Sequence, residues 1–235
     1  MYREHVQWFS PHLHRNMEFL WFGQFGRPLL MFPTSGGSYR ENEDFHLTAS
    51  VADKVDSGQL QLICVDSIDQ ESWYNNHAHP ADRARRHDAY DHYLRYELIP
   101  YIQNRAARGD LMAYGASFGA YHAANLAGRY PELVTRAILF SGLYDIHQFL
   151  YGYWDETCYF HCPTAYIPNL DQDWTRRLAN VGWVIATGEH DSLVNENRNF
   201  ANMLSSRGIP NHAEFWSGVF GHDWPWWREH LRRFV

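Results

Sequence analysis

Three short segments of the chain supply the side chains that acyl transfer requires: a hydroxyl, a carboxylate and an imidazole. Ser117 is the centre of GASFG, Asp191 ends GEHD, and His222 follows a glycine in GHDW. In such a set the imidazole takes the proton of the hydroxyl, and the carboxylate keeps the imidazole in the required tautomer. We therefore predict that Ser117, Asp191 and His222 form a catalytic triad, in the chain order nucleophile, acid, base.

The residues around Ser117 have the pattern of a nucleophile elbow, in which a strand turns sharply into a helix. The apolar run Leu111–Tyr114 meets an alanine-rich segment at GASFG. Its two glycines let strand and helix pack closely, while the strained serine points its hydroxyl outward. The helix would direct its first N–H groups at an oxyanion, which makes the Phe118 N–H one predicted donor. A turn whose serine only caps the helix is the alternative.

Two residues compete for the role of the acid. Glu189 stands two positions before Asp191 in the same turn and has one more methylene group. Asp191 is favoured because its shorter side chain suits a position further into the loop, beside a helix predicted from Ser192 whose dipole would help to keep the carboxylate ionised. Taken singly, Asp191 could be a helix N-cap and His222 an ordinary loop histidine.

A second oxyanion donor is expected in the loop PTSGGS, which follows an apolar run at Pro28–Phe32. A flexible loop after an early strand can expose backbone N–H groups close to the elbow. Gly36 is the leading candidate, with Ser35 and Gly37 as neighbours. An ordinary turn is the alternative.

Aromatic side chains are predicted to wall the substrate cleft. Trp73 and Tyr74 lie in the loop 66–80, which follows a buried strand, and more aromatic residues lie between Tyr151 and Tyr166. The carboxyl ends of parallel strands line the ligand crevice of an open α/β sheet, and large rings on such loops bury substrate at little conformational cost. Packing in the core is the competing interpretation of these rings.

Short apolar runs alternate with helical patterns, which predicts one α/β domain over residues 1–235, with a mostly parallel sheet covered by helices on both faces. An antiparallel hairpin is expected at the N-terminus, and the irregular, aromatic segment 146–172 is predicted to be a short cap. The expected strands are 2–10, 13–22, 28–32, 60–65, 111–114, 136–141, 181–187 and 212–216, and the expected helices include 43–55, 81–105 and 192–207.

Composition excludes several classes of partner. A net charge of −7 argues against binding to nucleic acid or to an anionic membrane, and no apolar run is long enough to span a bilayer. The charged N-terminus does not resemble a signal peptide, so a cytoplasmic protein is expected. Cys158, His161 and Cys162 lack an evident fourth ligand, so no metal is expected. The sequence leaves open whether the chain is a monomer or a homo-oligomer.

The segments GASFG, GEHDSLVNENRNFANML and GHDWPWW together resemble the Putative esterase (esterase D-like, antigen 85-like) family of the α/β-hydrolases, from about Pro28 to the C-terminus. The resemblance implies an α/β-hydrolase fold and a serine esterase that hydrolyses a small carboxylic ester through an acyl-enzyme, without a cofactor. PTSGGS departs from the His-Gly loop common in the family. An acyltransferase or thioesterase, and a catalytically silent binding protein, are the alternatives.

Overall fold

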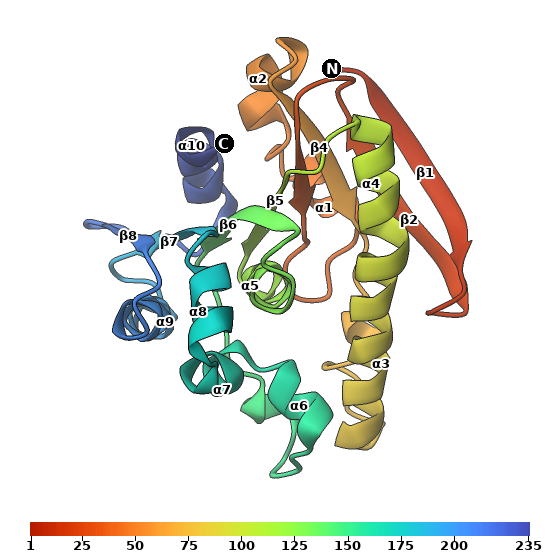
Figure 1. Cartoon of the computed structure of the whole chain (residues 1–235). Coiled ribbons are helices and arrows are strands. Elements are labelled where there is room, and N and C mark those ends of the chain that lie inside the picture. Colours follow the sequence, from red (N-terminus) through yellow and green to blue (C-terminus); the bar gives the residue numbers. More distant parts are fainter.

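A computed structural model describes all residues from 1 to 235. Its centre is one eight-stranded sheet with the strand order β1-β2-β4-β3-β5-β6-β7-β8 (Figure 1). The strands are β1 Arg3–Ser10, β2 Arg15–Phe22, β3 Arg27–Met31, β4 Leu60–Val65, β5 Leu111–Ala116, β6 Val134–Phe140, β7 Gly182–Gly188 and β8 Asn211–Trp216. The predicted α/β-hydrolase fold, with its N-terminal hairpin, is confirmed.

The direction of the strands agrees with the burial pattern of their residues. β1 and β2 form an antiparallel hairpin, and β2 joins β4 in antiparallel pairing. From β4 across to β8 every pair is parallel. β4 and β5 are buried along their whole length, as expected for parallel strands covered on both faces, whereas β1 alternates between exposed and half-buried residues at the sheet edge.

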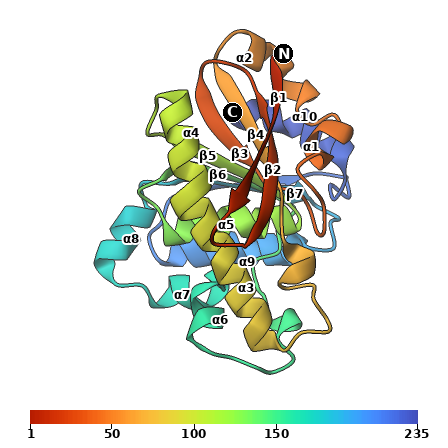
Figure 2. The ribbon, with the colours of Figure 1, turned by 90° about the vertical axis from the view of Figure 1, so that its right-hand side faces the viewer.

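Helices cover both faces of the sheet and divide the core into two layers (Figures 1 and 2). The larger layer lies under α3, α4, α5, α8 and α9, and the smaller under α2 and α10. The helices are α1 Glu41–Asp44, α2 Ala52–Asp56, α3 Pro80–Tyr93, α4 Ile99–Ala106, α5 Phe118–Arg129, α6 Glu156–Phe160, α7 Pro163–Tyr166, α8 Gln172–Leu178, α9 Val194–Ser206 and α10 Trp224–Phe234.

Two predicted helices are not regular. The helix expected over 43–55 is interrupted, because α1 ends at Asp44 and His46 turns the chain with φ +60° before α2 begins. The helix expected over 81–105 is continuous, but Leu94–Leu98 form a π-helical turn. This wider turn lies just before Pro100, whose ring and missing N–H do not fit a regular α-helical ladder.

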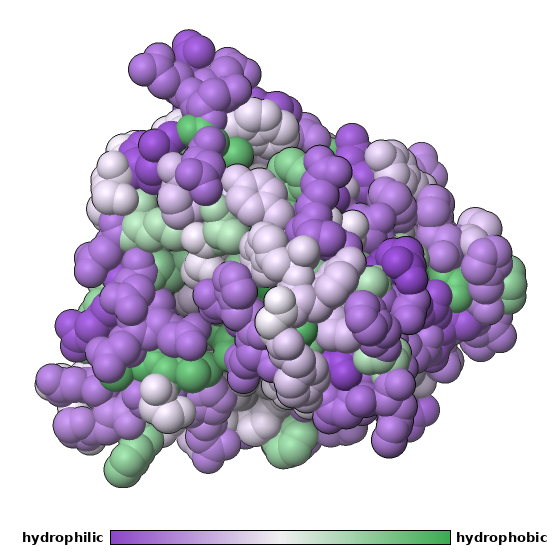
Figure 3. Space-filling view, turned by 90° about the horizontal axis from the view of Figure 1, so that it is seen from below, coloured by the Kyte–Doolittle hydropathy of each residue, from purple (hydrophilic) through white to green (hydrophobic).

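The segment 146–172 is ordered by two short helices, α6 and α7, and by 3₁₀ turns at His147–Phe149 and Ile167–Asn169. α6 packs against α3, and α7 packs against α5. Seen from below, where α6 and the lower end of α3 lie, the surface is mainly hydrophilic and its hydrophobic areas are separated (Figure 3). None of the helices has the length and apolar character that crossing a bilayer would require.

Candidate active site

Ser117 occupies the sharp turn between β5 and α5, as the GASFG pattern predicts. Its backbone has φ +55° and ψ −121°, and its N–H donates to the Phe140 carbonyl at 2.9 Å. A Cβ atom on Gly115 would lie 1.9 Å from the Gly119 carbonyl oxygen, so strand and helix meet at a distance that only glycine permits. This packing holds the strained serine with its hydroxyl at the carboxyl edge of the sheet.

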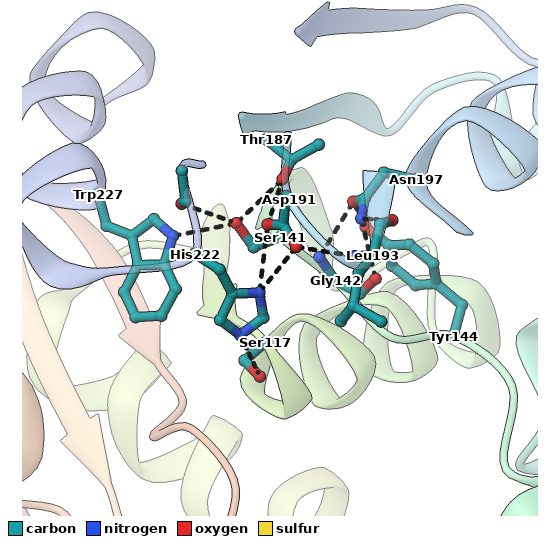
Figure 4. A network of polar contacts seen from close by, with 11 residues as sticks. Ser117, Ser141, Gly142, Tyr144, Thr187, Asp191, Leu193, Asn197, His222 and Trp227 are labelled. Carbon is teal, nitrogen blue, oxygen red and sulfur yellow. Dashed lines mark hydrogen bonds and ion pairs between the residues drawn. The ribbon is translucent and has the colours of Figure 1, made fainter. Parts of the chain in front are cut away.

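The three residues predicted as a triad are brought together from the loops that follow β5, β7 and β8 (Figure 4). The Ser117 hydroxyl lies 3.1 Å from His222 Nε2. On the other side of the ring, His222 Nδ1 lies 3.1 and 3.2 Å from the two carboxylate oxygens of Asp191. A proton on Nδ1 is donated to the carboxylate, which leaves Nε2 free to accept the serine proton.

The surroundings of Asp191 keep its carboxylate ionised. The side chain is fully buried, whereas that of His222 is 33% exposed. Burial alone would raise the pKa of Asp191, but donors from His222, the Thr187 hydroxyl at 2.5 Å and the Leu193 N–H at 2.8 Å outweigh it and hold the pKa below its usual value. A buried anion beside the imidazole is what stabilises an imidazolium.

Glu189, the competing acid, points elsewhere. Its carboxylate accepts hydrogen bonds from the Ser217 hydroxyl at 3.0 Å and the Gly218 N–H at 3.2 Å, and it is exposed to solvent. Of the two candidates, only Asp191 contacts His222.

The sequence did not reveal a network of polar residues that holds the loop of Asp191 and the loop of His222. The Ser141 hydroxyl accepts from Trp227 Nε1 at 3.2 Å, lies 3.1 Å from the Thr187 hydroxyl and donates to the Gly221 carbonyl at 3.1 Å (Figure 4). Asn197 accepts from the Gly142 N–H at 3.0 Å and donates to the Leu193 carbonyl at 2.8 Å. Ser141 stands just after β6, and this position at the catalytic edge is a signal that could have identified it.

Backbone packing also joins the acid and base loops. Gly221 has φ +76°, and a Cβ atom there would lie 2.2 Å from the Gly188 nitrogen. The chain before His222 therefore lies directly against the end of β7, which places the imidazole above Asp191.

The loop 33–38 lies against the elbow, since a Cβ atom on Gly119 would meet the Pro33 carbonyl oxygen at 2.5 Å. The Gly36 N–H, predicted to be the second oxyanion donor, donates to the buried Asp69 carboxylate at 3.3 Å. The Thr34 N–H donates to Glu41 at 2.6 Å and the Gly37 N–H to the Thr34 carbonyl at 3.0 Å. Ser35, one of the neighbouring candidates, keeps an N–H without a protein acceptor.

Three acids fix this loop. Asp69 joins the Gly36 N–H to His122 Nε2, 2.9 Å away on α5, and both side chains are buried. Burial raises the pKa of Glu41, which holds Thr34. Burial also raises the pKa of Asp66 to about 6, and Asp66 accepts the Tyr39 N–H at 3.2 Å.

The two aromatic residues predicted to wall the cleft have different positions. Trp73 has no exposed surface, and its Nε1 donates to the Tyr121 hydroxyl at 3.1 Å, so the prediction that it contacts substrate is wrong. It is a core residue beneath the elbow helix. Tyr74 is half-buried, donates to the Ser35 hydroxyl at 2.9 Å and packs edge-on against Phe118 at 5.1 Å. It therefore lies next to both candidate oxyanion donors.

The aromatic residues of the segment 146–172 are also divided between surface and core. Tyr151 and Trp154 are exposed, whereas Tyr166 is buried. Phe149 lies 5.5 Å from Phe118 and 5.0 Å from Tyr74, between ring centroids, so the beginning of the segment covers the residue next to the nucleophile.

Cys158, His161 and Cys162 do not converge. Both ring nitrogens of His161 are engaged, Nε2 with Asp88 at 3.0 Å and Nδ1 with Asn125 at 3.1 Å. A hollow of about 590 Å³ lies at the opposite edge of the sheet, where residues such as Gly182 and Asn211 line it at the amino ends of β7 and β8. Ser117 is the candidate reactive residue because the polar contacts of His222 and Asp191 converge there.

Comparison with known proteins gives the family and the fold of the chain. A family model described as Putative esterase matches residues 28–234. Similar solved structures include a ferulic acid esterase (TM-score 0.79, 17% identity, covering 100% of this chain and 96% of that one). An S-formylglutathione hydrolase from Agrobacterium tumefaciens is also similar, with a TM-score of 0.75 and 13% identity, covering 98% of this chain and 93% of that one. MPT51 of Mycobacterium tuberculosis has a TM-score of 0.73 and 17% identity, covering 98% of this chain and 95% of that one. At these identities the structures show the fold. No protein with a curated description matches the sequence.

Proposed function

The chain belongs to the Putative esterase family and is an esterase, and we propose that it hydrolyses small carboxylic esters through an acyl-enzyme on Ser117. The observation that carries this proposal is the unbroken series of contacts from the Ser117 hydroxyl through His222 to the buried Asp191. Each atom in the series has the proton donor or acceptor that nucleophilic catalysis by serine needs.

In the first half of the reaction, Ser117 Oγ attacks the ester carbonyl carbon while its proton passes to His222 Nε2. Asp191 stabilises the imidazolium that forms. The tetrahedral intermediate then collapses, His222 gives its proton to the departing alkoxide, and the alcohol leaves. The acyl group remains on Ser117.

In the second half, a water molecule attacks the acyl-enzyme and gives a proton to His222. The acid is released when the proton returns to Ser117 Oγ. Ser117 and His222 are both partly exposed, so water can reach the acyl group. Water is therefore the acceptor in this proposal.

The oxyanion of both intermediates is assigned to two backbone N–H groups, those of Phe118 and Ser35. Phe118 is the first residue of α5, and the first N–H groups of a helix have no intrahelical partner. Ser35 has the free N–H of the adjoining loop. Tyr74, which holds the Ser35 side chain and packs on Phe118, is proposed to contact the substrate beside them.

A panel of esters that varies the acyl and alcohol parts independently tests the proposal. We expect turnover of at least one ester class by the wild type and its loss in Ser117→Ala. Ser35→Ala is the matched control, because it removes a neighbouring hydroxyl but keeps the backbone N–H. Turnover by Ser117→Ala equal to that of the wild type would contradict the proposal. A product formed only when an added alcohol or thiol accepts the acyl group would indicate a transferase.

A further inference from the structure

Asp145, His147 and Cys162 gather a carboxylate, an imidazole and a thiol beside the elbow, and we propose that they bind a divalent cation of the zinc class. Their ligand atoms all lie within 4.8 Å of one another. Of the group Cys158, His161 and Cys162, this set contains only Cys162. Its other two members, Asp145 and His147, come from an earlier segment of the chain.

The ligand atoms can reach a tetrahedral ion after small adjustments in both directions. His147 Nδ1 lies 2.6 Å from Asp145 Oδ1. The Thr164 hydroxyl lies between the Asp145 carboxylate and the Cys162 thiol, 3.2 Å from Asp145 Oδ2 and 3.3 Å from Cys162 Sγ. Zinc bonds of about 2.0–2.3 Å place neighbouring ligand atoms roughly 3.5 Å apart. The widest pair, which is at most 4.8 Å apart, must therefore close by up to about 1.3 Å, and the 2.6 Å pair of His147 and Asp145 must open by about 0.9 Å.

The ligand types select the ion. A thiolate and an imidazole bind Zn²⁺, Co²⁺ and related ions, whereas Mg²⁺ and Ca²⁺ require oxygen ligands. Three protein ligands leave a fourth position, which water can fill because the His147 side chain is 58% exposed. The ring of His147 stacks on Trp154 with 4.3 Å between centroids and 4° between planes, so its orientation is already restricted.

A bound ion at this position would connect two parts of the structure. Asp145 follows β6, two residues after Leu143, whose N–H donates to the Ser117 carbonyl at 3.4 Å. Cys162 lies between α6 and α7, and both it and Cys158 pack in the same cluster as Phe118. An ion held by these three ligands therefore ties the segment 146–172 to the loop that supports the elbow.

Cobalt titration of the metal-free chain of residues 1–235 tests the site. A Co²⁺–thiolate bond gives a charge-transfer band in the near ultraviolet that carboxylate and surface histidine binding do not give. We expect a saturable band at one Co²⁺ per chain, which Zn²⁺ removes by competition. Cys158→Ser, which changes the other cysteine of the same segment, should keep the band.

Cys162→Ser should abolish the band, and His147→Gln should weaken Co²⁺ binding at least tenfold. Because His147 lies on the surface, its variant is expected to fold and remains informative if Cys162→Ser does not. The absence of a band in the wild type, or a band unchanged in His147→Gln, would overturn the proposal. The readout does not depend on ester turnover, so the result is independent of the role proposed for Ser117.

Discussion

The replacement of Asp191 by asparagine changes one atom of the proposed triad and almost nothing of its shape. The amide oxygen can still accept the Leu193 N–H, now at 2.8 Å. The amide NH₂ then faces His222 Nδ1, which must become an acceptor and move its proton to Nε2. A protonated Nε2 cannot take the proton of Ser117.

The structure predicts a large kinetic effect and a small effect on stability. The same exchange in another serine hydrolase lowers kcat about 10⁴-fold, which at 1.36 kcal/mol for each factor of ten corresponds to roughly 5 kcal/mol of activation free energy. The Thr187 hydroxyl can turn its proton to Ser141, 3.1 Å away, and accept from the amide instead. We therefore expect the free energy of unfolding to fall by only ~1 kcal/mol.

The assay is kcat/KM for a chromogenic ester, with urea unfolding of the same samples. Glu189→Gln is the matched control and should keep nearly full activity, since the Glu189 carboxylate accepts hydrogen bonds only from Ser217 and Gly218. Activity of Asp191→Asn within tenfold of the wild type would refute the reasoning. Together with the loss of activity in Glu189→Gln, that result would transfer the role of the acid to Glu189.

Three further predictions concern the residues behind the site. Asp69→Ala should lower kcat roughly 10- to 100-fold with little change in KM, because the loop carrying the Ser35 N–H loses its anchor at Gly36; an unchanged kcat would contradict this. Trp73→Ala should lower the free energy of unfolding by ~3–5 kcal/mol and leave KM unchanged, whereas a raised KM would restore its predicted substrate contact. The folded pKa of Asp66 is about 6, above its unfolded value near ~3.9, so the carboxyl stabilises the fold fully at low pH and that stabilisation is lost as pH rises through 6. Urea unfolding should show the wild type losing ~2–3 kcal/mol relative to Asp66→Asn between pH 4 and 7, and parallel curves would count against this assignment.

The parts of the site that the sequence predicts are those set by local pattern and strand direction. The parallel strands are continuous apolar runs, and their carboxyl ends meet at one edge, so loops containing Ser117, Asp191 and His222 converge there. The elbow is a local motif, and its two glycines indicate the close packing of strand and helix.

Features that depend on distant partners could not be predicted in this way. Ser35 is proposed in place of Gly36 because Asp69, from another part of the chain, accepts the Gly36 N–H. Trp73 is buried because Tyr121 on α5 supplies a partner for its indole N–H. Neither contact leaves a periodic signal in the sequence.

The central claim, that Ser117 is the nucleophile activated by His222, is tested most directly by a fluorophosphonate probe and peptide mass spectrometry. We predict one adduct per chain, located on Ser117, with labelling at least 10²-fold slower in His222→Gln, because the hydroxyl then lacks its base. Rapid labelling at another residue, or labelling of Ser117 at the same rate in His222→Gln, would contradict the account.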